Sequence, residues 1–152
     1  MLLGHEKESF LHLPTPIEYL PRISIDLGIN FYMKRDDLTN IGMGGNKLRK
    51  LEYLIYDAKK KGATMIVTVG GAQTNHGRLT AAVCAKFDLK CAIVAIDEYP
   101  GELSANLLLD EIMGCPVYLV ANDNIHTIDD QFEIASKKII SEYETKGEKV
   151  YF

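Results

Sequence analysis

A glycine-rich loop followed by a lysine is the first part of the sequence with chemical potential. The segment IGMGGNKLRK spans residues 41–50, and its glycines allow a ligand to approach the backbone closely. It is not a P-loop, because Asn46 precedes the lysine, and it does not match GxGxxG. Lys47 falls in the first helical turn, where the helix dipole, Arg49 and Lys50 favour a neutral amine that attacks a carbonyl group. The alternative is a solvated lysine at a helix start.

A second polar segment joins an expected strand to an expected helix. It reads TVGGAQTNHGRLTAA and spans residues 68–82. Gln73, Thr74, Asn75 and His76 gather at the helix N-terminus, where free N–H groups favour an anion such as a carboxylate or a cofactor oxygen. The alternative is an ordinary turn in which Thr74 or Asn75 caps the helix.

Alternating strand and helix patterns surround these segments. Apolar runs predict strands at 64–69, 91–96, 116–120 and 148–152. Amphipathic patterns predict helices from Lys47 to Gly62 with Asn46 as N-cap, over 76–87 and 103–113, and from a cap at Asp123 or Asn124 to about Thr145. The alternation predicts an α/β fold, a three-layer parallel sheet with helices on both faces. Ligands of such sheets bind beyond the carboxyl ends of the strands, here at 70–75, 97–101 and 121–124.

The first part of the chain has a different pattern. Three prolines within residues 13–22 predict an extended segment, and residues 29–34 predict a strand. A polar, glycine-rich loop follows over residues 35–46. We therefore divide the chain into an N-terminal part, residues 1–46, and an α/β domain, residues 47–152.

Composition excludes several classes of protein. A net charge of −4 argues against a nucleic-acid partner. The sequence has neither an apolar run that could span a membrane nor a signal-peptide pattern. Three cysteines, an odd number in apolar segments, favour reduced thiols and a cytoplasmic protein. Their spacing, and the absence of HExxH, predict no metal site.

Taken together, TPIEYLPR, KRDDLT, GGNKLRKLEYL and GGAQTNH resemble the pyridoxal-phosphate enzymes of fold type II. Within that group the chain is similar to D-cysteine desulfhydrase and 1-aminocyclopropane-1-carboxylate deaminase. The resemblance implies that Lys47 holds the cofactor as a Schiff base and then transfers protons. Asn75 would hydrogen-bond the phenolic oxygen of the cofactor, and Asn46 and Gly45 would shape the approach to it.

The same resemblance assigns the substrate site. Thr74, as a catalytic and binding residue, would line the substrate carboxylate site with Asn75, His76 and Gln73. The substrate would be a small amino acid, and the reaction a deamination or β-elimination of the lyase or hydrolase type. The family usually has serine at position 74, so the methyl group of Thr74 makes the choice of substrate uncertain.

The resemblance also implies that this chain is an N-terminal half. Residues 1–46 would belong to the larger domain of such enzymes, and the α/β domain would be cut before the phosphate-binding loop. We therefore weigh an enzyme against a fragment that is inactive alone and needs a homo-oligomer or a complementing C-terminal half. A third reading is a non-catalytic α/β domain that binds an anion.

Overall fold

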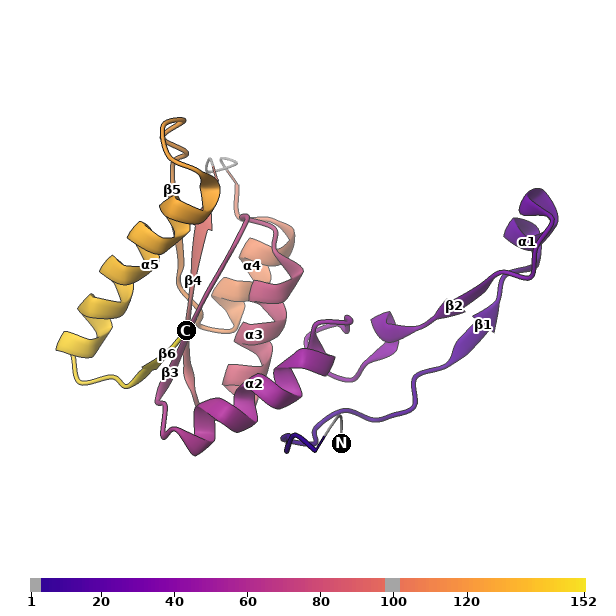
Figure 1. Cartoon of the computed structure of the whole chain (residues 1–152), viewed down its shortest axis with the longest axis horizontal. Coiled ribbons are helices and arrows are strands. Elements are labelled where there is room, and N and C mark those ends of the chain that lie inside the picture. The colour runs from indigo at the N-terminus through magenta and orange to yellow at the C-terminus, as the bar shows by residue number, and fades with distance from the viewer. Residues whose placement is uncertain (1–3, 98–101) are drawn as a thin grey trace.

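A parallel four-stranded sheet organises the computed structural model, which describes residues 4–97 and 102–152. Its strands are β3 (Met65–Gly70), β4 (Lys90–Ile96), β5 (Val117–Val120) and β6 (Val150–Tyr151). They lie in the order β5-β4-β3-β6, with Ile66 opposite Cys91 in the register of the central pair (Figure 1). The strands occur where the apolar runs predict them, which confirms the parallel sheet.

Helices cover both faces of this sheet, as predicted. One face carries α2 (Leu48–Lys60), α3 (Asn75–Lys86) and α4 (Ala105–Ile112), and the other carries α5 (Ile128–Thr145) (Figure 1). Successive residues of β3 alternate between two cores: Ile66 packs with α2 and α3, whereas Met65 and Val67 pack with α5. Burial of each such side chain contributes about 1.5–3 kcal/mol, so the sheet is a firm base for the loops at its edge.

An arm extends away from the sheet and its helices (Figure 1). In it β1 (Ile17–Tyr19) pairs antiparallel with β2 (Tyr32–Lys34), and α1 (Pro21–Leu27) connects them. The prediction of an extended segment over residues 13–22 is wrong at its end, because Pro21 begins a helix. Proline suits the first helical position, where its fixed φ is favourable and an N–H would have no partner.

Two helix starts also differ from the predictions. Lys47, rather than Asn46, occupies the N-cap position of α2, and no side chain caps that helix. The cap of α5 is Thr127, whose hydroxyl oxygen accepts a backbone N–H at 3.1 Å, rather than Asp123 or Asn124. The start of α2 is therefore held by contacts of the preceding loop and not by a local cap.

A buried carboxylate on α2 attaches the N-terminal segment to the α/β domain. Glu52 is 2% exposed, and its Oε1 accepts the N–H groups of Phe10 at 3.1 Å and Leu11 at 3.0 Å. Its other oxygen forms an ion pair with Lys7. A carboxylate removed from water needs such partners, so this cluster fixes residues 7–11 along α2.

Replacement of Glu52 by alanine should lower the free energy of unfolding by about 2–4 kcal/mol, because two N–H groups and the Lys7 ammonium lose their acceptor. Chemical denaturation measures the change. Glu133→Ala, which removes an exposed pair with Lys137, should cost less than about 1 kcal/mol. Equal losses for the two variants would contradict the anchoring role of Glu52.

Candidate active site

The glycine-rich loop lies against α3, one helical turn beyond the N-cap Thr74. The Nη2 atom of Arg78 on α3 donates a hydrogen bond to the Gly44 carbonyl at 3.2 Å. A Cβ atom at Gly45 would lie 2.8 Å from Leu79 Cδ1, so the backbone of the loop contacts the helix directly. Arg78 follows the N-cap Thr74 by one helical turn. The fold therefore brings the two segments identified from sequence together.

Arg78 makes this contact from a buried position. It is 7% exposed, and desolvation lowers the pKa of its guanidinium, while the charge of Asp110 on α4 opposes that shift. Asp110 is 1% exposed, and burial raises its pKa to about 6. Within the described part of the chain neither Asp110 oxygen has a hydrogen-bond partner. The two charges therefore interact without a direct ion pair.

The loop glycines make room for the chain itself. Gly44 has φ +77°, and a Cβ atom there would overlap the Asp37 carbonyl oxygen. The Gly45 N–H donates to Thr39 Oγ1 at 2.9 Å. These contacts close the loop tightly just before Lys47 and so fix where its side chain leaves the backbone.

Lys47 and Arg49 have different surroundings. The Arg49 guanidinium is bound by Asp36, with Nε–Oδ2 at 2.6 Å and Nη2–Oδ1 at 2.7 Å, and it donates to Thr15 at 3.1 Å. The Lys47 side chain is half-buried, and among residues 4–97 and 102–152 it has no ion-pair or hydrogen-bond partner. Asp36 compensates the charge of Arg49. Burial, and then Lys47, lower the pKa of Lys50.

The second motif forms a capped turn at the start of α3. Thr74 is the N-cap, and its Oγ1 accepts the Gly77 N–H at 3.4 Å, which fits the structural alternative for this segment. The methyl group of Thr74 packs toward Gly70 and Gly77, where a Cβ atom at Gly77 would lie 2.5 Å from it. In the described structure no backbone group accepts the N–H of Asn75 or His76. The turn thus keeps two donors free at the positive end of the helix dipole.

Two residues from neighbouring segments hold this turn, and sequence reasoning did not assign either a role. Asp97, at the end of β4, accepts the Ala72 N–H at 3.1 Å. Asn106 in the first turn of α4 hydrogen-bonds both Gln73 and Asn75. Asp97 could have been found from its position directly after β4, where the predicted 97–101 ligand loop begins. Residues 98–101 of that loop lie outside the described residues.

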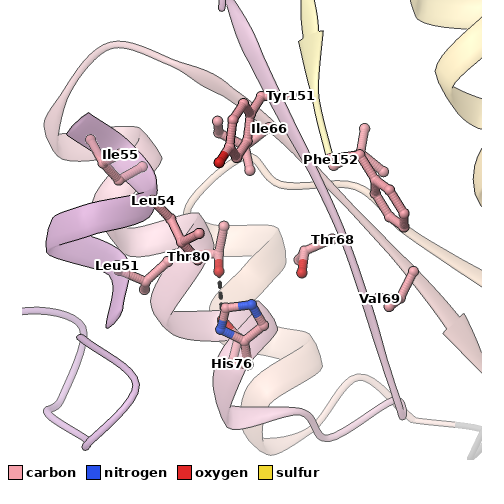
Figure 2. Close-up of a pocket in the computed structure, with 11 residues that line it drawn as sticks. Leu51, Leu54, Ile55, Ile66, Thr68, Val69, His76, Thr80, Tyr151 and Phe152 are labelled. Atoms are coloured by element: carbon pink, nitrogen blue, oxygen red, sulfur yellow. Dashed lines mark hydrogen bonds between the residues drawn. The ribbon is translucent and has the colours of Figure 1, made fainter. Parts of the chain in front are cut away.

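His76 connects the turn to an apolar pocket. The pocket has a volume of about 250 Å³, and Figure 2 shows the His76 side chain directed into it, toward Leu51, Thr68 and Thr80. The His76 Nδ1 atom is buried and has no hydrogen-bond partner among the described residues. Burial, then the charges of Lys50 and Lys47, lower the pKa of His76 to about 4. The ring is therefore neutral near pH 7, with one nitrogen still available.

The structure brings some of the predicted site residues together and separates others. Lys47 is one of the two lysines whose charge, after burial, lowers the pKa of His76. Gln73 is turned toward α4 by both of its side-chain amide atoms. Lys47 does not line the apolar pocket, which His76 shares with α2, β3 and β6. The binding and catalytic roles of Lys47, Asn46, Gln73, Thr74, Asn75 and His76 remain predictions.

The described residues contain neither a membrane-spanning helix nor a metal-binding cluster. None of their helices is both long and apolar enough to cross a bilayer. No group of three or more His, Cys, Asp or Glu side chains among them is arranged to hold a metal ion. The three cysteines, Cys84, Cys91 and Cys115, are buried and free.

Comparison with known proteins defines the class. The sequence model of the pyridoxal-phosphate-dependent enzymes matches residues 9–152, so the chain belongs to this family. The family confirms both the resemblance seen in the sequence and pyridoxal phosphate as the cofactor. Among solved structures, an ACC deaminase homologue superposes with a TM-score of 0.84 at 38% identity, over 99% of this chain and 44% of that one.

Curated relatives have two kinds of name. A Thermotoga maritima protein, named as a candidate 1-aminocyclopropane-1-carboxylate deaminase, is 44% identical over 138 residues, which is 91% of this chain and 43% of the relative. The D-cysteine desulfhydrase of Salmonella typhimurium is 55% identical over 100 residues, or 65% of this chain and 30% of that enzyme. The chain therefore spans less than half the length of these relatives.

A pH titration by nuclear magnetic resonance tests the environment of His76. We expect a midpoint near pH 4, whereas His126, whose pKa is raised by Asp123, should titrate above the usual 6.5. Because the unfolded chain binds a proton at His76 near pH 6.5, stability should fall as the pH drops from 6.5 to 4. His76→Gln should remove that part of the loss. A His76 midpoint near 6.5 would contradict the buried, cation-facing ring.

Proposed function

We propose that this chain is the N-terminal part of a pyridoxal-phosphate-dependent enzyme that deaminates, or eliminates a β-substituent from, a small amino acid. D-cysteine desulfhydrase and 1-aminocyclopropane-1-carboxylate deaminase are the two activities that its relatives' names suggest. The observation that carries the proposal is the bond from Arg78 to the Gly44 carbonyl, which joins the loop before Lys47 to the helix that begins at the Thr74 turn. Among the described residues the Lys47 amine has no partner. The alternatives to this proposal are a fragment that is inactive alone and an α/β domain that only binds an anion.

The donor set of the described site fits the cofactor. Lys47 Nζ, which no described residue binds, would hold the cofactor aldehyde covalently, with Asn46 and Gly45 beside it. The Asn75 side chain would donate to the ring oxygen of the cofactor. When bound, pyridoxal phosphate supplies an electron sink for charge that develops on the substrate. Lys47 Nζ would also take the proton from the substrate α-carbon.

Residues of the turn would hold the substrate. The free N–H groups of Asn75 and His76 suit a carboxylate at the N-terminus of α3. A neutral His76 would offer the substrate a ring nitrogen, and it would not repel the Lys47 side chain when that side chain is charged. The Thr74 hydroxyl lies on the same turn, and its methyl group packs toward Gly70 and Gly77, which supports a site with space for a small amino acid. Gln73 would support this turn through α4.

The reaction class and the surroundings follow from the same proposal. Release of ammonia with consumption of water places the chemistry among lyases and hydrolases. Three free, buried cysteines support a reducing, cytoplasmic setting. We also propose a division at residue 46, with residues 1–46 in a larger domain, because the arm exposes large apolar side chains.

The exposed apolar surface of this arm favours a partner that covers it. Ile17, Ile25 and Tyr32 are 66%, 80% and 59% exposed, which is costly for a surface that stays in water. The chain also spans only 43% of its Thermotoga maritima relative. The partner is therefore either a complementing C-terminal half or a second copy in a homo-oligomer.

Labelling tests the assignment of the cofactor lysine. The protein is mixed with pyridoxal phosphate, reduced with borohydride, and digested for peptide mapping. We expect the label at Lys47, loss of that label in Lys47→Arg, and its retention in Lys50→Arg, which changes the neighbouring lysine on the same helical turn. Label elsewhere, or none, would favour the anion-binding domain.

Complementation tests the fragment reading. Addition of a polypeptide with the remaining part of the Thermotoga maritima relative should produce sulfide from D-cysteine or ammonia from 1-aminocyclopropane-1-carboxylate. Backbone amides of β1 and β2 should become protected from hydrogen exchange at the same time. Turnover by the chain alone would contradict the need for a complementing half, and so would addition that produces neither change.

A further inference from the structure

The amide groups of Gln73, Asn75 and Asn106 form a chain of hydrogen bonds between the turn and α4. The Asn106 N–H donates to Gln73 Oε1 at 2.8 Å, and Asn106 Nδ2 donates to the Gln73 carbonyl at 2.8 Å and to Asn75 Oδ1 at 3.2 Å. Gln73 Nε2 donates to the Ser104 carbonyl at 3.3 Å. Each of these three side-chain amides is therefore hydrogen-bonded to at least one other residue of the group.

Backbone groups fix, directly or through Asn106, the orientation of all three side-chain amides. A backbone carbonyl only accepts, so the Asn106 atom that faces the Gln73 carbonyl must be Nδ2. Because that same Nδ2 group also faces Asn75, the Asn75 atom opposite it must be the acceptor Oδ1. The orientation of Asn75 thus follows from a main-chain oxygen and not from a choice between two similar atoms.

This orientation has a chemical consequence. With Oδ1 occupied by Asn106, the Asn75 Nδ2 group is the free end of this amide, and no described residue accepts its hydrogens. Nδ2 and the free Asn75 N–H are both donors, which suits an anionic oxygen. We propose that Asn106 is a positioning residue that holds the Asn75 amide with its donor toward the ring oxygen of the cofactor; this rests on the proposed function.

The start of α4 is built around this contact. Ala105, which precedes Asn106, has φ +48°, a left-handed conformation that is unfavourable for a residue with a Cβ atom. Such a conformation persists only where the surrounding contacts determine it. The bonds from Asn106 and Ser104 to Gln73 supply those contacts, so α4 begins where it can reach the turn.

Asn106→Asp tests the polarity of the chain. The variant keeps the shape of the side chain but replaces a donor by an acceptor that faces the Gln73 carbonyl and Asn75 Oδ1. Rotation of the Asn75 amide relieves the repulsion and turns its oxygen toward the cofactor. Ser104→Asp is the matched control, because it adds the same charge at the exposed N-cap of α4, where only the backbone carbonyl, which the substitution keeps, contacts the amides. The helix dipole favours an acidic residue at both positions, so both variants should fold.

Two readouts separate the positioning role from the proposed function. In the protein without cofactor, nuclear magnetic resonance should show one Asn75 Nδ2 proton moving downfield in Asn106→Asp, as it now donates to a carboxylate, and unchanged in Ser104→Asp. With pyridoxal phosphate, the concentration that half-labels Lys47 under borohydride should rise at least about tenfold in Asn106→Asp and less than about threefold in Ser104→Asp.

Each outcome decides a different claim. An unshifted Asn75 amide, or equal weakening by the two variants, would overturn the positioning role. A shifted amide in a protein whose Lys47 never takes the label would retain the orientation of Asn75 and reject the proposed function. Asn106→Ala, which adds no charge, should raise the half-labelling concentration by a factor between those of the two acidic variants, and it decides the question if Asn106→Asp does not fold.

Discussion

The contact between Arg78 and the Gly44 carbonyl is the constraint on which the candidate site depends. It ties a loop that comes before α2 to a helix that comes after β3, and so joins the segment that leads into Lys47 to the helix that begins at the Thr74 turn. A guanidinium withdrawn from water must have a compensating acceptor or charge, and Gly44 and Asp110 supply these. The cost of burying Arg78 thus fixes the loop in one position.

Local sequence patterns predicted most of the sheet and its helices. Runs such as TMIVTV and CAIVAI are short, apolar and β-branched, and they become β3 and β4 because a strand covered on both faces has no polar side. The pattern fails at Pro21, because the prolines predict extended chain where α1 begins. It also fails at the caps of α2 and α5, because several polar residues near each start could serve and tertiary contacts decide among them.

Only the site residues that lie within the two sequence motifs could be predicted. GGNK and QTNH identified Lys47 and the Thr74–His76 turn, and the family confirms the cofactor. Arg78, Asp97 and Asn106 act on these motifs through contacts between residues more than twenty positions apart, so spacing along the chain could not identify them. The role of Gln73 at a substrate stays a prediction, and the bonds of its amide to the start of α4 could not be predicted from the sequence.

The proposed site requires the Lys47 amine to lie close enough to the turn for its charge to act on His76. Nuclear magnetic resonance titration of His76 in Lys47→Met, compared with the unaltered chain, measures this directly. Removal of the charge should raise the His76 midpoint above its value near pH 4, because one of the cations that oppose protonation is gone. An unchanged midpoint would place the amine away from the turn and contradict the account.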